Sequence, residues 1–87
     1  MMYESIDQIP GLEKIQNRLK RRGLVMVKSG DWEKHGPHEG MPFMVIIGLC
    51  RFIGTKEETW VAIYPKRIYE LENPCDWDKG VLLPVLE

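Results

Sequence analysis

A run of strongly apolar residues, MPFMVIIGLCRFI at positions 41–53, constrains the fold of this chain more than any other feature. Its many β-branched residues favour a strand over a helix. The next segment, GTKEE, is typical of a turn, and TWVAIY at positions 59–64 has the composition of a second strand. The sequence therefore predicts a central antiparallel hairpin, with strands at about 43–53 and 59–64.

Both faces of the first strand of this hairpin are apolar. Successive side chains of a strand point to opposite faces, so Val45 and Ile47 fall on one side and Ile46 and Cys50 on the other. A strand with one face in water alternates apolar and polar residues, and this strand does not. We therefore expect cover on both faces, from the core on one side and from a helix, a curled sheet or a partner chain on the other. A homodimer is the simplest source of that second cover.

A helix is predicted ahead of the hairpin, over about residues 10–22. Proline suits the first turn of a helix, and Leu12, Ile15 and Leu19 recur at the spacing of one helix face. Gly23 is a natural C-terminal stop. A strand at about 24–28 follows directly.

The remaining segments complete a single α+β domain, mostly β, that spans residues 1–87. Residues 1–9 have little pattern and are expected to be partly frayed, whereas the glycines and prolines of 29–42 predict a long loop. Residues 66–72 form one helical turn or a short edge strand, and a last strand at about 81–86 contains a proline. The predicted fold is an N-terminal helix followed by a four- to five-stranded antiparallel sheet. A small SH3-like barrel fits this order of elements.

Composition indicates a protein of the cytoplasm. The net charge of −1 gives no general attraction to nucleic acid or to acidic membranes. The longest apolar run is shorter than the roughly 20 residues that cross a bilayer, and no signal peptide is recognisable. With two cysteines and no secretory signal, we expect both thiols to be reduced.

The predicted helix is strongly basic and suggests one alternative function. It holds five basic residues against one acidic residue, Glu13. Lys14, Arg18 and either Arg21 or Arg22 share a helix face, and such a stripe could contact phosphates. The simpler interpretation is a solvated outer face whose charges suit the helix dipole. Nucleic-acid binding through residues 14–22 is therefore the second hypothesis.

A metal or thiol site is the third hypothesis. His35 and His38 in the sequence HGPH have the spacing of half a metal site, to which Cys50 or Cys75 would have to contribute. However, the two cysteines are isolated, and Cys50 lies in the apolar run, where burial raises the pKa of a thiol. We expect no metal, no cofactor and no catalytic residues.

Aromatic residues outside the hairpin support the leading hypothesis. Trp32, Tyr69 and Trp77 lie in polar segments, where large rigid side chains either anchor a protein partner or close the ends of a small barrel. Tyr69 and Trp77 are flanked by Glu and Asp, so an acidic aromatic surface that suits a basic partner is expected. Trp60 and Tyr64 share a strand face and either pack in the core or line a groove. The sequence thus predicts a non-catalytic protein-binding module: an adaptor, an accessory subunit or an inhibitor.

Overall fold

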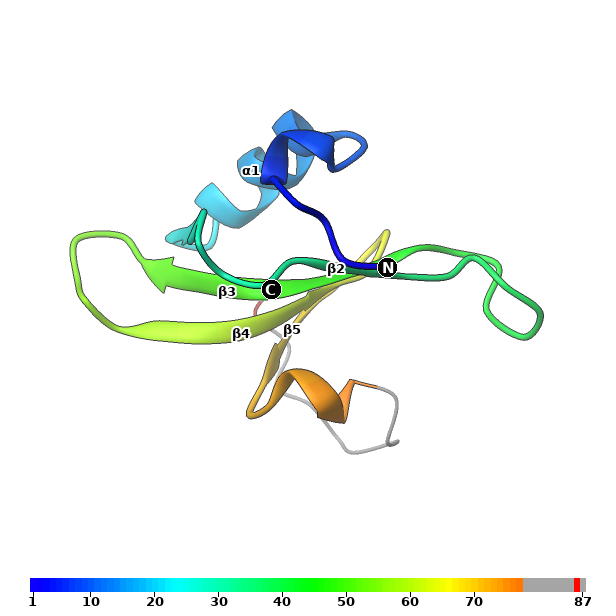
Figure 1. Cartoon of the computed structure of the whole chain (residues 1–87). Coiled ribbons are helices and arrows are strands. Elements are labelled where there is room, and N and C mark those ends of the chain that lie inside the picture. Colours follow the sequence, from blue (N-terminus) through cyan, green and yellow to red (C-terminus); the bar gives the residue numbers. More distant parts are fainter. Residues whose placement is uncertain (78–85, 87) are drawn as a thin grey trace.

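Five antiparallel strands, one α-helix and two short 3-10 helices make up the part of the chain that this computed structural model describes, residues 1–77 and 86 (Figure 1). Along the chain they are η1 (Ile6–Gln8), α1 (Leu12–Lys20), β1 (Leu24–Met26), β2 (Glu33–His35), β3 (Val45–Phe52), β4 (Glu58–Ile63), β5 (Ile68–Leu71) and η2 (Pro74–Asp76). The α+β class, with strand as its main component, is confirmed.

The long strand β3 organises the sheet, as its apolar sequence predicted. On one side it pairs with β4, and β4 pairs with β5. On the other side β3 pairs with two short strands, with β2 through Val45–Ile47 and with β1 through Cys50–Phe52. These strands form an open sheet in the order β1-β3-β4-β5, and β2 lies off this path, paired with β3. The SH3-like barrel suggested by the order of elements is not confirmed.

The helix α1 is shorter than the predicted span of 10–22. The chain turns at Pro10 and Gly11 before the helix begins at Leu12, and it turns again after Lys20. The φ of Gly23 is 72°, a backbone conformation that favours glycine, which agrees with its predicted role as the helix stop. Ile15 and Leu19 are buried against the sheet, so the predicted apolar stripe faces the core.

One face of the sheet, the helix face, is covered by α1 and the N-terminal segment (Figure 1). Even-numbered residues of β3 point to this face, where Ile46 and Cys50 are almost fully buried. The core here continues into β1, β4 and β5 through Leu24, Val61 and Ile68. This larger core joins the helix to the sheet.

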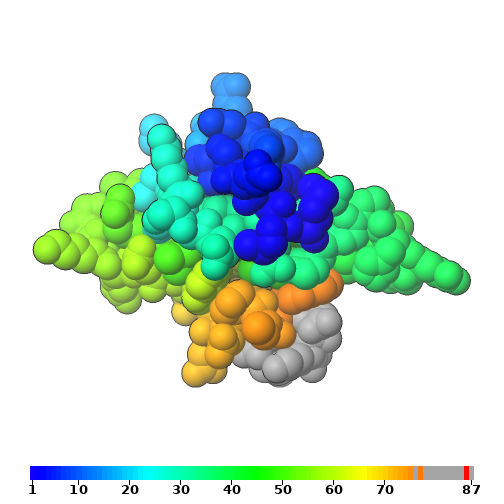
Figure 2. All heavy atoms as spheres, viewed as in Figure 1, coloured from blue at the N-terminus to red at the C-terminus, as the bar shows by residue number. Residues whose placement is uncertain are grey.

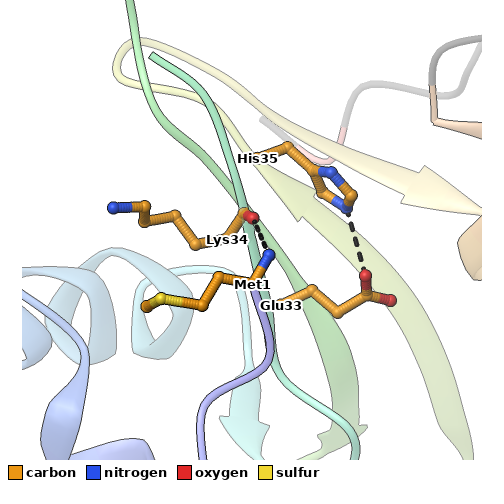
Figure 3. A network of polar contacts seen from close by, with 4 residues as sticks. All are labelled: Met1, Glu33, Lys34 and His35. Atoms are coloured by element: carbon orange, nitrogen blue, oxygen red, sulfur yellow. Dashed lines mark hydrogen bonds and ion pairs between the residues drawn. The ribbon is translucent and has the colours of Figure 1, made fainter. Parts of the chain in front are cut away.

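The first nine residues are held in place, where the sequence analysis expected partial fraying. Tyr3, Ile6 and Ile9 belong to the core on the helix face. The N-terminus also runs along the outer edge of β2: the Tyr3 N–H donates to the Trp32 carbonyl at 2.8 Å, and the Lys34 N–H donates to the Met1 carbonyl at 2.8 Å. The terminal ammonium of Met1 donates in turn to the Lys34 carbonyl at 2.9 Å (Figure 3). Backbone pairing of this kind leaves no pattern in the side chains.

The opposite face of the sheet has a smaller core made by the chain itself. Val45 and Ile47 of β3 are 0% exposed there, packed with Met41, Ala62 and Leu71. Trp60, Tyr64 and Trp77 lie over this cluster and are half-buried. Both faces of β3 are therefore covered, as predicted, but without a second copy. A homodimer is therefore not needed to cover the second face of β3.

The structure adds one unpredicted strand, β2, and decides between the two alternatives for residues 66–72. β2 lies inside the segment 29–42, which was expected to be a loop, and β5 occupies the segment 66–72, for which a short strand was one of two alternatives. The strand predicted at 81–86 lies outside the described residues except for Leu86, whose N–H donates to the Ile68 carbonyl at 3.0 Å.

Candidate partner-binding site

Trp32, the first predicted partner anchor, belongs to the core. Its side chain is 1% exposed on the helix face, and its indole N–H donates to the Val27 carbonyl at 2.9 Å. The ring lies over Gly48 of β3 so closely that a Cβ atom at Gly48 would sit 2.2 Å from two indole carbons. Trp32 directly precedes β2, and the pairing of β2 with β3 directs its side chain inward. A buried indole with its polar atom bonded is not available to a partner, which corrects this expectation.

Trp77 and Tyr69, the other two predicted anchors, are half-buried on the opposite face. The indole of Trp77 stacks on the imidazole of His35, with ring centroids 4.4 Å apart and an interplanar angle of 28°. Tyr69 meets Tyr64 edge to face at a centroid distance of 5.1 Å. The two predicted anchors therefore contact different neighbours, and Tyr69 lies in a groove.

That groove, the aromatic groove, is built where β4 turns into β5. The Tyr64 N–H donates to the Arg67 carbonyl at 2.8 Å, which closes a tight turn with Pro65 and Lys66 at its centre. Ala62 is the cross-strand partner of Tyr69, so Tyr64 lies diagonally across from Tyr69 on the same face. Phe43, just before β3, adds a third ring at 5.9 Å from Tyr64. The groove has a volume of about 410 Å³, and its described lining residues are Phe43, Tyr64, Pro65, Lys66, Arg67 and Tyr69.

The charge around Tyr69 is the reverse of the predicted acidic aromatic surface. Neighbours along a strand point to opposite faces, and Glu70 pairs with Val61, which belongs to the helix face. Glu70 is thus directed away from the aromatic groove. Two exposed basic residues from the turn, Lys66 and Arg67, form its rim instead, and none of its described lining residues is acidic. The groove consequently suits an acidic segment and not a basic one.

Phe43 was missed by sequence reasoning, whereas Lys66 and Arg67 were considered only as possible aids to nucleic-acid binding. Phe43 fell inside the predicted strand 43–53, although β3 begins at Val45, and its ring is 38% exposed. The sequence did hold one signal for this groove, because Tyr64 was expected either to pack in the core or to line a groove. Tyr64 does both, since it packs on the opposite-face core and lines the aromatic groove.

The basic stripe of the helix is partly committed to internal contacts. The guanidinium of Arg18 donates to the Tyr64 carbonyl at 2.8 Å, and that of Arg22 donates to the Arg18 carbonyl. Lys14 and Arg21 are exposed on the outer face of α1. Of the four residues proposed to touch nucleic acid, two hold the backbone of this chain.

The predicted metal or thiol residues are dispersed. The Nε2 atom of His35 is 3.3 Å from a carboxylate oxygen of Glu33 (Figure 3), whereas His38 has its Nδ1 atom 2.8 Å from the Glu39 carbonyl oxygen. Cys50 is buried on the helix face, away from the face on which His35 stacks, and burial raises the pKa of its thiol to about 12. Cys75 is exposed. Within residues 1–77 and 86, no three His, Cys, Asp or Glu side chains gather into a potential metal site.

Comparison with known proteins adds no relative. No family model matches the chain, and no curated protein or solved structure shows significant similarity to it. Within the described part of the chain, α1 and the short 3-10 helices fall well below the length of a membrane-spanning helix.

Proposed function

We propose that this protein is a non-catalytic binding module that holds an extended segment of another protein in the aromatic groove. The observation that carries the proposal is the groove itself: three aromatic rings and a proline face a cleft of about 410 Å³ whose rim is basic. The partner segment is apolar where it meets the rings and acidic where it passes Lys66 and Arg67.

The rings supply the energy of binding in this proposal. Aromatic side chains bury a large area and lose little conformational entropy, because few torsions have to be fixed. Their mutual contacts hold them in place before a ligand arrives, since Tyr64 is in contact with both Phe43 and Tyr69. Grooves lined by aromatic rings and proline are one of the recurring ways in which domains bind extended, proline-rich peptides.

The basic rim supplies selectivity. Exposed charges at the edge of a binding site contribute little affinity but choose between partners and orient them. A segment with Asp or Glu beside its apolar residues is attracted, and a basic segment is repelled. The role of such a module, as an adaptor, an accessory subunit or an inhibitor, depends on the protein that carries the segment.

A cytoplasmic location and the absence of catalysis belong to the same proposal. The exposed thiol of Cys75 is unpaired, which suits a reducing compartment. The thiol of Cys50, with a pKa of about 12, stays protonated at neutral pH and is a poor nucleophile.

Selection from a phage-displayed peptide library on the immobilised protein tests this function. We expect enriched peptides to combine proline or large apolar residues with Asp or Glu. For the best peptide, Phe43→Ala should raise the Kd at least about tenfold, because it removes one wall of the groove. Met2→Ala is the matched control, since Met2 is an exposed apolar residue, 51% accessible, that is not among the described lining residues of the aromatic groove.

Charge reversal tests the rim in the same assay. Lys66→Glu should weaken binding about five- to tenfold, whereas Lys56→Glu, at an exposed position of the β3–β4 turn, should leave it unchanged. Enrichment of basic peptides, or equal effects of the two reversals, would contradict the proposal. The nucleic-acid alternative predicts instead that the protein retains DNA or RNA at low salt and that Lys14→Glu with Arg21→Glu releases it.

A further inference from the structure

The sheet has three outer edges among the described residues, and two of them are occupied. The N-terminal residues pair with the outer edge of β2 through Met1 and Tyr3. The N–H of Leu86 bonds to Ile68 on β5. No described segment pairs with the outer edge of β1, which is the terminal strand in the order of the sheet. Unpaired edges attract other extended chains, and most proteins protect them.

The hydrogen bonds that hold β1 show which of its backbone groups point outward. The Gly23 carbonyl accepts from the Ile53 N–H at 2.8 Å, and the Val27 N–H donates to the Leu49 carbonyl at 2.9 Å. Inward-bonded residues alternate with outward-facing ones in an antiparallel pair, so Val25 also bonds to β3. The N–H and C=O groups of Leu24 and Met26 therefore face the open edge.

A groove follows this edge. It has a volume of about 470 Å³ and lies between α1, β1 and the end of β3. Its floor is apolar, and two of its apolar side chains, Val25 and Ile53, are 41% and 53% exposed. Figure 2 shows the chain around residues 20–30, in cyan to teal, at the surface between the N-terminal segment and the β3–β4 turn.

The charged side chains of this groove all have the same sign. Lys20, Lys28 and Arg51 are exposed around it, and none of its described lining residues is acidic. Glu58 is the cross-strand neighbour of Arg51, but it belongs to β4, on the far side of β3 from β1. An extended chain lying along β1 would thus meet three cations.

We propose that the open edge of β1 binds an acidic, extended segment of another protein as an added strand. The outward groups of Leu24 and Met26 would supply its main-chain hydrogen bonds, as in other cases of strand addition. Lys20, Lys28 and Arg51 would pair with its carboxylates. A second copy of this chain does not fit, because joining two β1 edges would bring the two sets of cations together. This site is separate from the aromatic groove and does not depend on it.

Hydrogen exchange provides a direct test with a defined probe. The probe is a capped eight-residue peptide of alternating Val and Glu, and its controls replace Glu by Lys or place Pro in the middle. On adding the Val–Glu peptide to the full chain, we expect exchange of the Leu24 and Met26 amides to slow at least about tenfold, because they become hydrogen-bonded. The Val25 amide, already bonded to β3, should change little. Lys28→Glu should weaken binding about five- to tenfold, whereas Lys56→Glu should not.

Four results would overturn the proposal. They are no protection of Leu24 and Met26 at millimolar peptide, equal binding of the Val–Lys peptide, undiminished binding of the Pro-containing peptide, and protection that rises with protein concentration alone. The last would mean that copies of the chain pair with one another. Failure here leaves the aromatic groove untouched, because Phe43→Ala and Lys66→Glu report on that groove separately.

Discussion

The two faces of the sheet are covered in different ways, although both begin from the same strand. On the helix face, α1 and the N-terminal segment close over Ile46 and Cys50, and Trp32 fills the space above Gly48. On the opposite face, the cover comes from aromatic side chains of the sheet and the segment after it, and these remain half-buried.

This difference teaches where stability and binding are located in a small domain. The helix face buries the Trp32 indole almost completely and gains packing energy from it. The opposite face keeps its rings partly accessible, so they can still bury area against a partner. We therefore expect substitutions on the helix face to change the free energy of unfolding most, and substitutions on the opposite face to change binding.

The largest expected effect is that of Trp32→Ala. Removing a fully buried indole should lower the free energy of unfolding by about 3–5 kcal/mol, because it leaves a cavity on the helix face. Trp60→Ala, on the opposite face, should cost less than about half of that, since Trp60 is half-buried. Urea denaturation followed by far-UV circular dichroism measures both. Equal losses would mean that the two faces contribute alike.

A smaller loss in the free energy of unfolding is expected for Gly48→Ala. The added Cβ would lie 2.2 Å from the Trp32 ring, and overpacking of this kind costs about 1–3 kcal/mol. In a Trp32→Leu background the same change should cost less than about 1 kcal/mol, because the obstacle is gone.

Gly54→Ala is the control for this double-mutant cycle. Its φ of 80° strains an alanine, but nothing lies within 4 Å of the added Cβ, so its cost should not depend on residue 32. A cost of Gly48→Ala that is the same in both backgrounds would contradict the close contact with Trp32.

The smallest expected change in the free energy of unfolding, counted per pH unit, comes from ionisation of the Cys50 thiol. Burial raises its pKa from 9.0 to about 12 in the folded protein, so its contribution is complete below pH 9 and is lost as pH rises toward 12. In that window the unfolded chain has released this proton and the folded chain has not. The free energy of unfolding should therefore fall by about 1.4 kcal/mol per pH unit through this group alone.

Cys50→Ala separates the contribution of this thiol to the pH dependence of stability from the contributions of the other groups that titrate at alkaline pH. The variant is less stable at pH 8, because it loses a buried side chain, but the gap between it and the parent protein should narrow above pH 9. Chemical denaturation at pH 8, 9.5 and 10.5 measures the gap. A constant gap would show that the thiol is accessible to water on the helix face.

Much of the fold could be predicted from the sequence, because local patterns carry it. The apolar run placed β3, the turn residues after it placed β4, and the spacing of Ile15 and Leu19 gave the buried face of α1. The missed elements have no such pattern. β2 is three residues long and entirely half-buried. The N-terminal residues are held partly by backbone hydrogen bonds, which depend little on the type of side chain, and partly by the core side chains of Tyr3, Ile6 and Ile9.

The candidate site was predictable only in part. Tyr69 lines the aromatic groove, whereas Trp32 is buried and Trp77 stacks on His35. Composition alone could not distinguish these three, because each is a large ring in a polar segment. Among the described residues the rim of the groove is basic, with Glu70 directed to the other face because residues adjacent in sequence point to opposite faces of a strand.

By itself, the sequence determined the class of the domain, its central hairpin and the need to cover both sides of β3, because a strand whose two faces are both mostly apolar cannot leave either face in water. Only the tertiary structure decided what provides that cover. Strand register selects which aromatic side chain fits over Gly48, which rings gather at the β4–β5 turn and which edge stays open. Register is set by pairing between segments far apart in the chain, and that information is not local to any of them.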